Sequence, residues 1–151
     1  MTIRPADGQV DRRAVLAGLF YFGNVFAVGF VLGVIRTFII EPRVGHLTAI
    51  MVETPAMLAV SFDAAMRVIE RLDVPRGFGP RLVMGGSAVT LLLLAEFLLG
   101  TILQRLTASV FFTGFTTLSG AISLGAFAIF AALPAFLGQI AQRNERARTG
   151  T

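Results

Sequence analysis

Three charged residues in otherwise apolar sequence are the ones whose types could do chemistry. They are Glu53, Glu96 and Arg36. Two carboxylates in an apolar environment can bind a cation, relay protons or hold a cationic ligand, and a nearby guanidinium can act as their counter-ion. A charge at the centre of a bilayer costs about 2.5–3.5 kcal/mol. If these residues lie in a membrane, we therefore expect them to face protein rather than lipid.

Composition removes most other kinds of site. The 151 residues include no cysteine, no lysine and a single histidine, His46. Cysteine-ligated metals, Cys–His pairs and Ser–Lys pairs are therefore excluded, and we interpret His46 as a boundary residue. The segment Pro75–Pro80 lacks the pattern of a phosphate-binding loop. We assign no catalytic residue, no metal and no cofactor.

Hydropathy predicts the elements that must position the three charges. Hydrophobic residues make up 55% of the chain, charged residues 15%, and the mean hydropathy is +0.77. A bilayer core of about 30 Å needs about 20 apolar helical residues. We predict spans at about 14–35, 46–67, 82–103 and 117–140. Residues 106–116 are interpreted as a surface-lying or re-entrant segment.

The second of these spans is the weakest, because Glu53, Pro55 and Asp63 interrupt it. A soluble amphipathic helix is the alternative there. With four spans the fold class is all-α, an integral membrane four-helix bundle. The predicted organisation is a tail at 1–13, a single transmembrane domain at 14–140 and a tail at 141–151.

The arginines predict the orientation. Ten of the thirteen fall in the two tails and in the stretch from Arg67, at the end of the second span, to Arg81 before the third. Arginine and lysine accumulate on the cytoplasmic side, so we expect both termini there. The absence of lysine indicates a GC-rich bacterial genome, and the bacterial inner membrane is the expected location. Because the arginines flank the spans, they suit anionic lipid head groups better than nucleic acid.

Counting along the spans places several polar residues at one depth. Glu53 and Glu96 each fall about 10 Å from the outer boundary, with Arg36 one or two turns above them. Ser119 and Ser123 occupy the same outer half of the last span. We predict that these five residues form an intramembrane polar cluster. Two interpretations stay open, an ion pair that only holds helices together and a functional carboxylate site.

Two further pairs have local roles. Asp63 and Arg67 are four residues apart, which suits a helical ion pair at the cytoplasmic boundary. Gly29 and Gly33 have the spacing that lets two membrane helices approach closely, and Gly85–Gly86 permits the same.

Part of the chain resembles a family of small, functionally uncharacterised four-helix inner-membrane proteins of proteobacteria. The resemblance covers roughly Gly29–Gly100 and implies no activity. Its motifs are Gly33-x-x-Arg36, Pro42-x-x-Gly45, Glu53-x-Pro55-x-Met57, Arg67, Arg81-x-x-Met84-Gly85 and Ala95-Glu96. It implies a compact four-span protein in which Arg36, Glu53 and Glu96 are motif residues.

The first functional hypothesis is a small non-enzymatic membrane protein, an accessory or interaction subunit of a larger assembly. Its expected partners are the lipid bilayer and either another membrane protein or further copies of itself. The alternative is a protein that transports ions, protons or small solutes through Glu53 and Glu96. A membrane enzyme acting on lipid or quinone is the least favoured hypothesis.

Overall fold

The computed structural model describes residues 5–102, 105 and 107–149, and side chains within 12–140 apart from 103, 104 and 106. The described chain is all-helical. Its elements are α1 (Pro5–Ile35), the π-helical turn η1 (Arg36–Ile40), α2 (Glu41–Val44), α3 (His46–Arg71), α4 (Phe78–Ile102), α5 (Ala108–Gly114) and α6 (Leu118–Thr149). In this part of the chain four segments are long and apolar enough to cross a membrane: Arg12–Val44, His46–Arg71, Phe78–Ile102 and Leu118–Ile140.

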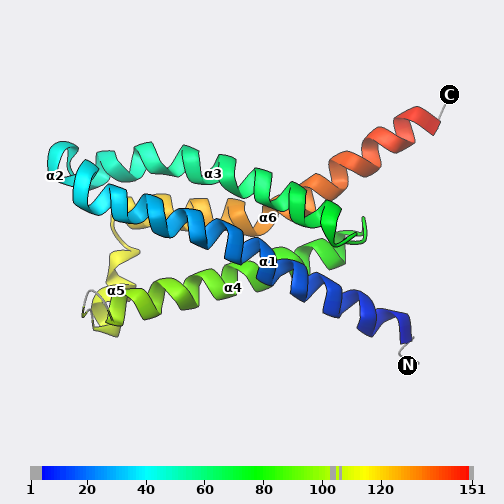
Figure 1. The fold of residues 1–151 in the computed structure, drawn as a ribbon, viewed down its shortest axis with the longest axis horizontal. Coiled ribbons are helices and arrows are strands. Elements are labelled where there is room, and N and C mark those ends of the chain that lie inside the picture. The colour runs from blue at the N-terminus through cyan, green and yellow to red at the C-terminus, as the bar shows by residue number, and fades with distance from the viewer. Residues whose placement is uncertain (1–4, 103–104, 106, 150–151) are drawn as a thin grey trace.

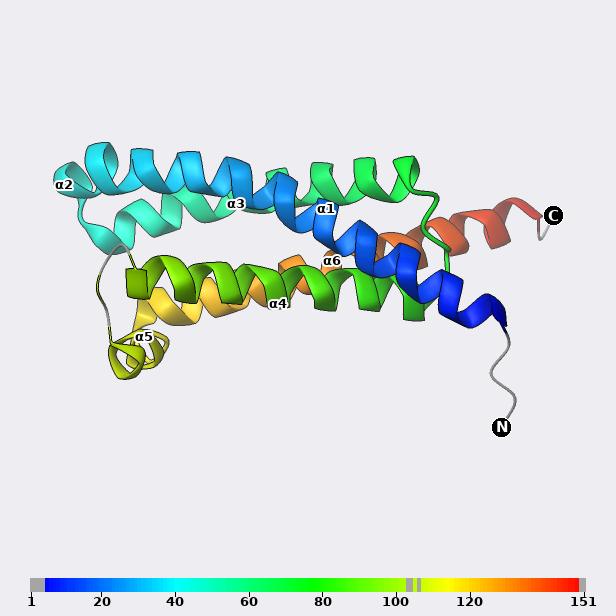
Figure 2. The same cartoon turned by 60° about the horizontal axis from the view of Figure 1, so that its bottom comes forward.

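The four long helices lie side by side in two layers. Helix α1 packs on α3 and α4, and α6 packs on the other side of α3 and α4. Figure 1 shows the four helices running roughly along one axis. Figure 2 shows α3 and the second part of α1 above α4 and α6, while the first part of α1 slopes down to the level of α4 and α6. The start of α1, the α3–α4 turn and the end of α6 lie at one end, which we call the termini end. The opposite end, with η1, α2 and α5, is the α5 end.

The helices differ from the sequence-based spans mainly at their ends. The predicted span 46–67 is a continuous helix that includes Pro55, and it extends to Arg71. Helix α4 begins at Phe78 rather than at residue 82, and residue 103 lies outside the described chain. In the segment predicted at 106–116, residue 106 is not described, and Ala108–Gly114 forms α5 as an element separate from α6. The tails beside the spans are also helical, from Pro5 in α1 and as far as Thr149 in α6.

An aromatic pair fills the centre of the four helices. The rings of Tyr21 on α1 and Phe130 on α6 stack with centroids 4.4 Å apart. The Tyr21 hydroxyl donates a 3.1 Å hydrogen bond to the carbonyl oxygen of Phe130. Met84 and Val25 are fully or almost fully buried beside them. A hydroxyl placed in an apolar interior needs such a partner, so this bond fixes α1 against α6.

Glycines bring α4 very close to its neighbours on the termini side of that pair. A Cβ atom on Gly85 would collide with the backbone carbonyl of Ala131 on α6. A Cβ on Gly18 of α1 would collide with Ser87 and with the carbonyl oxygen of Met84, both on α4. The Gly29–Gly33 pair is packed differently, since Gly29 faces the Met57 side chain and a Cβ on Gly33 would meet nothing within 4 Å.

The neighbouring glycines of α4 give a matched test of this packing. We expect Gly85→Ala to destabilise the protein by about 1–3 kcal/mol, because the added methyl group must push α6 away. In Gly86→Ala the Cβ meets nothing within 4 Å. That variant should be unchanged or slightly more stable, since alanine favours helix. Thermal unfolding in detergent, followed by circular dichroism, measures both. Equal shifts in the two variants would contradict the close α4–α6 approach.

Candidate functional site

The polar cluster begins where α1 ends. The π-helical turn η1 follows Ile35, and its bond from the Glu41 N–H to the Arg36 carbonyl brings residues five apart into line. The Arg36 Nη1 atom consequently lies 3.6 Å from Glu41 Oε2. The other oxygen of Glu41, Oε1, lies 2.8 Å from the Nδ1 atom of His46 at the start of α3. Arg36 is thus held on one side by a carboxylate from its own segment.

Arg36 also joins this segment to α3. Its Nε atom lies 2.6 Å from Glu53 Oε2, and about a fifth of each side chain is exposed. Short contacts between opposite charges in a water-poor setting are stronger than exposed ones. Two of the predicted cluster residues, from different helices, therefore form an ion pair.

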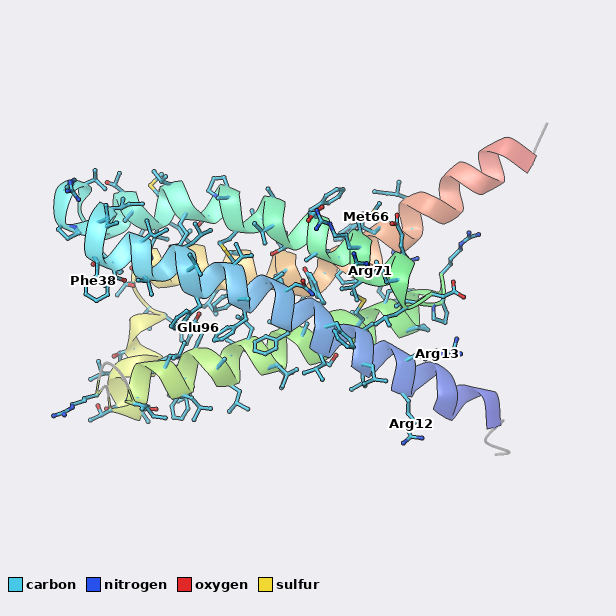
Figure 3. All side chains as sticks on the ribbon, viewed as in Figure 1. Arg12, Arg13, Phe38, Met66, Arg71 and Glu96 are labelled. Atoms are coloured by element: carbon cyan, nitrogen blue, oxygen red, sulfur yellow. The ribbon has the colours of Figure 1, made fainter. Side chains whose placement is uncertain are left out.

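Glu96 reaches the same place from α4 without a direct ionic partner. Figure 3 shows its side chain extending from α4 toward α1. It lines a cavity together with Arg36 and Glu53, and it feels the charges of both. Among the described side chains, none forms a hydrogen bond or an ion pair with Glu96. Among the described residues, Glu96 is therefore the carboxyl group of the cluster without a direct partner.

Three cavities meet at Arg36 and Glu96, which line all of them. The central cavity, of about 190 Å³, lies between the four helices and also contains Glu53 and Ser123. The α1–α4 groove, of about 390 Å³, has phenylalanine or glycine at half of its lining positions. The α5–α6 cavity, of about 440 Å³, also contains Ser119 and His46. The α5 end is thus hollow where the charges gather.

The two predicted serines lie at the rim of these cavities. Ser123 lines the central and α5–α6 cavities, and its hydroxyl donates to the Ser119 carbonyl at 3.1 Å. The Ser119 hydroxyl lies 3.0 Å from that of Thr117. All five residues of the predicted cluster therefore line these cavities. Two direct contacts join them, the Arg36–Glu53 ion pair and the hydrogen bond from Ser123 to Ser119.

The central cavity closes toward the termini end. Phe130 and Val25 line its inner part together with Ser61, and Tyr21 lies behind them against both Ser61 and Phe130. The Ser61 hydroxyl donates to the Met57 carbonyl at 2.8 Å. The central cavity is consequently bounded by the Tyr21–Phe130 pair on the side of the termini end.

The two other predicted pairs, Asp63–Arg67 and Gly29–Gly33, are not part of the polar cluster. Asp63 and Arg67 form a bidentate ion pair, with Arg67 Nε and Nη2 each 3.0 Å from a carboxylate oxygen, and both side chains are exposed. Gly29 and Gly33 line the α1–α4 groove next to the polar cluster.

Sequence reasoning missed Glu41 and gave His46 only a boundary role. Glu41 is five residues after Arg36, a spacing that a π turn brings together but an α-helix does not. The charge sequence Arg36-x4-Glu41 was the available signal. Nothing in the amino-acid pattern announced the π turn itself.

Comparison of the chain with protein-family models, with curated proteins and with solved structures found no match. Within the described residues, no group of three or more His, Asp or Glu side chains is arranged to hold a metal ion. The chemistry available to the cluster is therefore that of its carboxylates and its guanidinium.

The Arg36–Glu53 pair predicts a strong energetic coupling. Replacing Arg36 by glutamine leaves a half-buried carboxylate without its partner, and we expect a loss of about 3 kcal/mol in unfolding free energy. Arg36→Gln combined with Glu53→Gln should recover most of it. The exposed Asp63–Arg67 pair is the control, with an expected coupling of about 0.3–0.5 kcal/mol. Equilibrium unfolding in mixed micelles, followed by circular dichroism, gives both double-mutant cycles. Additive effects of the Arg36 and Glu53 changes would contradict the pairing.

Proposed function

We propose that this chain is a membrane protein that binds a cation at Glu96 and transports it. The proposal rests on the observation that Glu96 lines three cavities yet has no direct ionic partner in the described chain. A carboxylate in a setting of low polarity is costly unless a positive charge or a proton accompanies it. Binding of a cation supplies that charge, and reversible binding of this kind is one of the steps that a carrier requires.

The charges around Glu96 support this choice of ligand. Arg36 is the positively charged residue facing the central cavity and is shared between Glu53 and Glu41. In the central cavity one guanidinium faces the carboxyl groups of Glu53 and Glu96, so acidic groups outnumber basic ones there. An anion would meet repulsion from this arrangement, whereas a cation would complete it. The alternative in which the ion pair only joins helices accounts for Arg36 and Glu53 but not for Glu96.

The proposed setting is a four-helix bundle in a bacterial inner membrane, with both termini in the cytoplasm. Arginines gathered at the termini end support this orientation, and Figure 3 labels Arg12, Arg13 and Arg71 there. The polar cluster would then lie toward the periplasmic face.

The test of this function is cation or proton flux into proteoliposomes. We expect Glu96→Gln to slow flux about tenfold or more, because a charge-assisted contact worth about 1.5–3 kcal/mol is removed. Glu70→Gln, on the exposed last part of α3, is the matched control and should leave flux unchanged. Flux of H⁺, Na⁺ and K⁺ that is equal in the wild type and Glu96→Gln would overturn the proposal.

A second candidate function is an accessory subunit of a larger membrane assembly. It is favoured by glycines that face open space, since Cβ atoms on Gly23, Gly86 and Gly125 would meet nothing within 4 Å. Small residues on the outer surface of a membrane helix allow a partner helix to approach closely. The partner would be another membrane protein or a second copy of this chain.

The subunit hypothesis predicts a stable complex. Purified in mild detergent at native expression levels, the protein should run as a complex larger than 16.1 kDa plus its detergent. Gly125→Leu should shift it to the monomer, because a larger side chain blocks helix approach. Native mass spectrometry measures the stoichiometry. An isolated monomer without a co-purifying partner would count against this role while leaving the transport proposal intact.

A further inference from the structure

The α1–α4 groove has a composition that suits one class of ligand. Its walls are the rings of Phe26, Phe30 and Phe38 with aliphatic side chains and glycine backbone between them. Its polar side chains are Arg36, Glu96 and Thr37. Because Arg36 is already paired with Glu53 and Glu41, the charge left for a ligand in the groove is that of Glu96. The groove is therefore apolar along its length and negative at one place.

Size separates the possible occupants. The groove holds about 390 Å³, within the range of about 300–1,000 Å³ typical of pockets for small organic ligands. A proton or a bare metal ion needs far less room, and a hydrated metal ion would find few oxygen ligands along apolar walls. The aromatic rings suit an organic cation, which is attracted to the face of a phenyl ring as well as to a carboxylate.

The groove is also reachable from the bilayer. Phe38 on its wall is 75% exposed, and Phe30 is exposed beside it. Figure 3 shows Phe38 extending from η1 and Glu96 from α4, at the α5 end of the protein. A ligand dissolved in the membrane could thus reach Glu96 laterally, between α1 and α4, without passing through water.

Resting on the proposed cation-binding function, we propose that the α1–α4 groove binds lipophilic organic cations, with the positive centre at Glu96 and the apolar body against the phenylalanines. Gly29 and Gly33 line the groove, and the ligand occupies the open space over Gly33. The central cavity, which shares Arg36 and Glu96 with the groove, offers the cation a second position deeper among the helices.

The probe is tetraphenylphosphonium, and its control is tetraphenylborate, an anion of nearly the same shape. Binding is measured by equilibrium dialysis of the full chain in lipid nanodiscs. We expect saturable binding of the phosphonium and none of the borate. Glu96→Gln should weaken phosphonium binding about tenfold or more, the effect of a contact worth about 1.4 kcal/mol.

A pair of glycine variants tests the place of binding. Gly33→Leu should fill the groove and also weaken binding about tenfold, whereas Gly23→Leu, on the same helix but outside the groove, should not. Both variants should fold, because a Cβ atom at either position would meet nothing within 4 Å. Thermal melting followed by circular dichroism checks this. Equal binding by the two variants would place the ligand elsewhere and overturn the inference.

The outcomes separate this inference from the function on which it rests. Absence of saturable phosphonium binding, with Glu96-dependent flux of H⁺, Na⁺ or K⁺ retained, would refute the organic ligand and keep the transport proposal. Phosphonium binding that is equal in the wild type and Glu96→Gln would refute the proposed site. Binding that Gly33→Leu and Glu96→Gln both weaken, and that Gly23→Leu does not, would support it.

Discussion

The cost of placing charge away from water governs the α5 end of this protein. Three carboxylates and one arginine meet among helices that are otherwise apolar, and each must find a counter-charge, a proton or a solvated cavity. Glu53 is satisfied by Arg36 at 2.6 Å, and Glu41 takes a longer contact from the same guanidinium and a shorter one from His46. Glu96 is left to the cavities. The cavities spare the Glu96 carboxyl group a tightly packed apolar environment, in which an unpaired carboxylate would be far less stable.

The packing between the helices differs between the termini end and the α5 end. Toward the termini end, glycines such as Gly85 let the backbones of neighbouring helices touch, and the Tyr21–Phe130 pair fills the centre. Beyond that pair the space between the helices holds side chains and cavities instead. The same four helices therefore provide a closely packed part around the Tyr21–Phe130 pair and a part with cavities that holds the candidate site. Proteins commonly draw their binding regions from such less tightly packed parts.

The four long helices and the gathering of polar residues near one end could be predicted from the sequence, for reasons that concern particular residues. A helix rises by a fixed amount per residue, so counting from the span ends brought Glu53 and Glu96 to one depth, with Arg36 one or two turns above them. Counting could not find Glu41, because its contact with Arg36 depends on a π turn that no residue type demands. Nor could spacing choose between Gly85 and Gly86, one of which touches α6 while the other faces open space. The cavities depend on such choices, and so they emerge only from the packed structure.

The contact between Gly85 and Ala131 has a mechanical meaning as well. At this contact the backbones of α4 and α6 touch. Glu96 lies eleven residues further along α4, at a distance of about 16 Å along the helix axis. Rocking α4 by about 10° on this fulcrum would swing the carboxylate by about 3 Å, roughly the length of a hydrogen bond. A tilt of α4 too small to disturb the Gly85–Ala131 contact would thus be enough to make or break a contact of the Glu96 side chain.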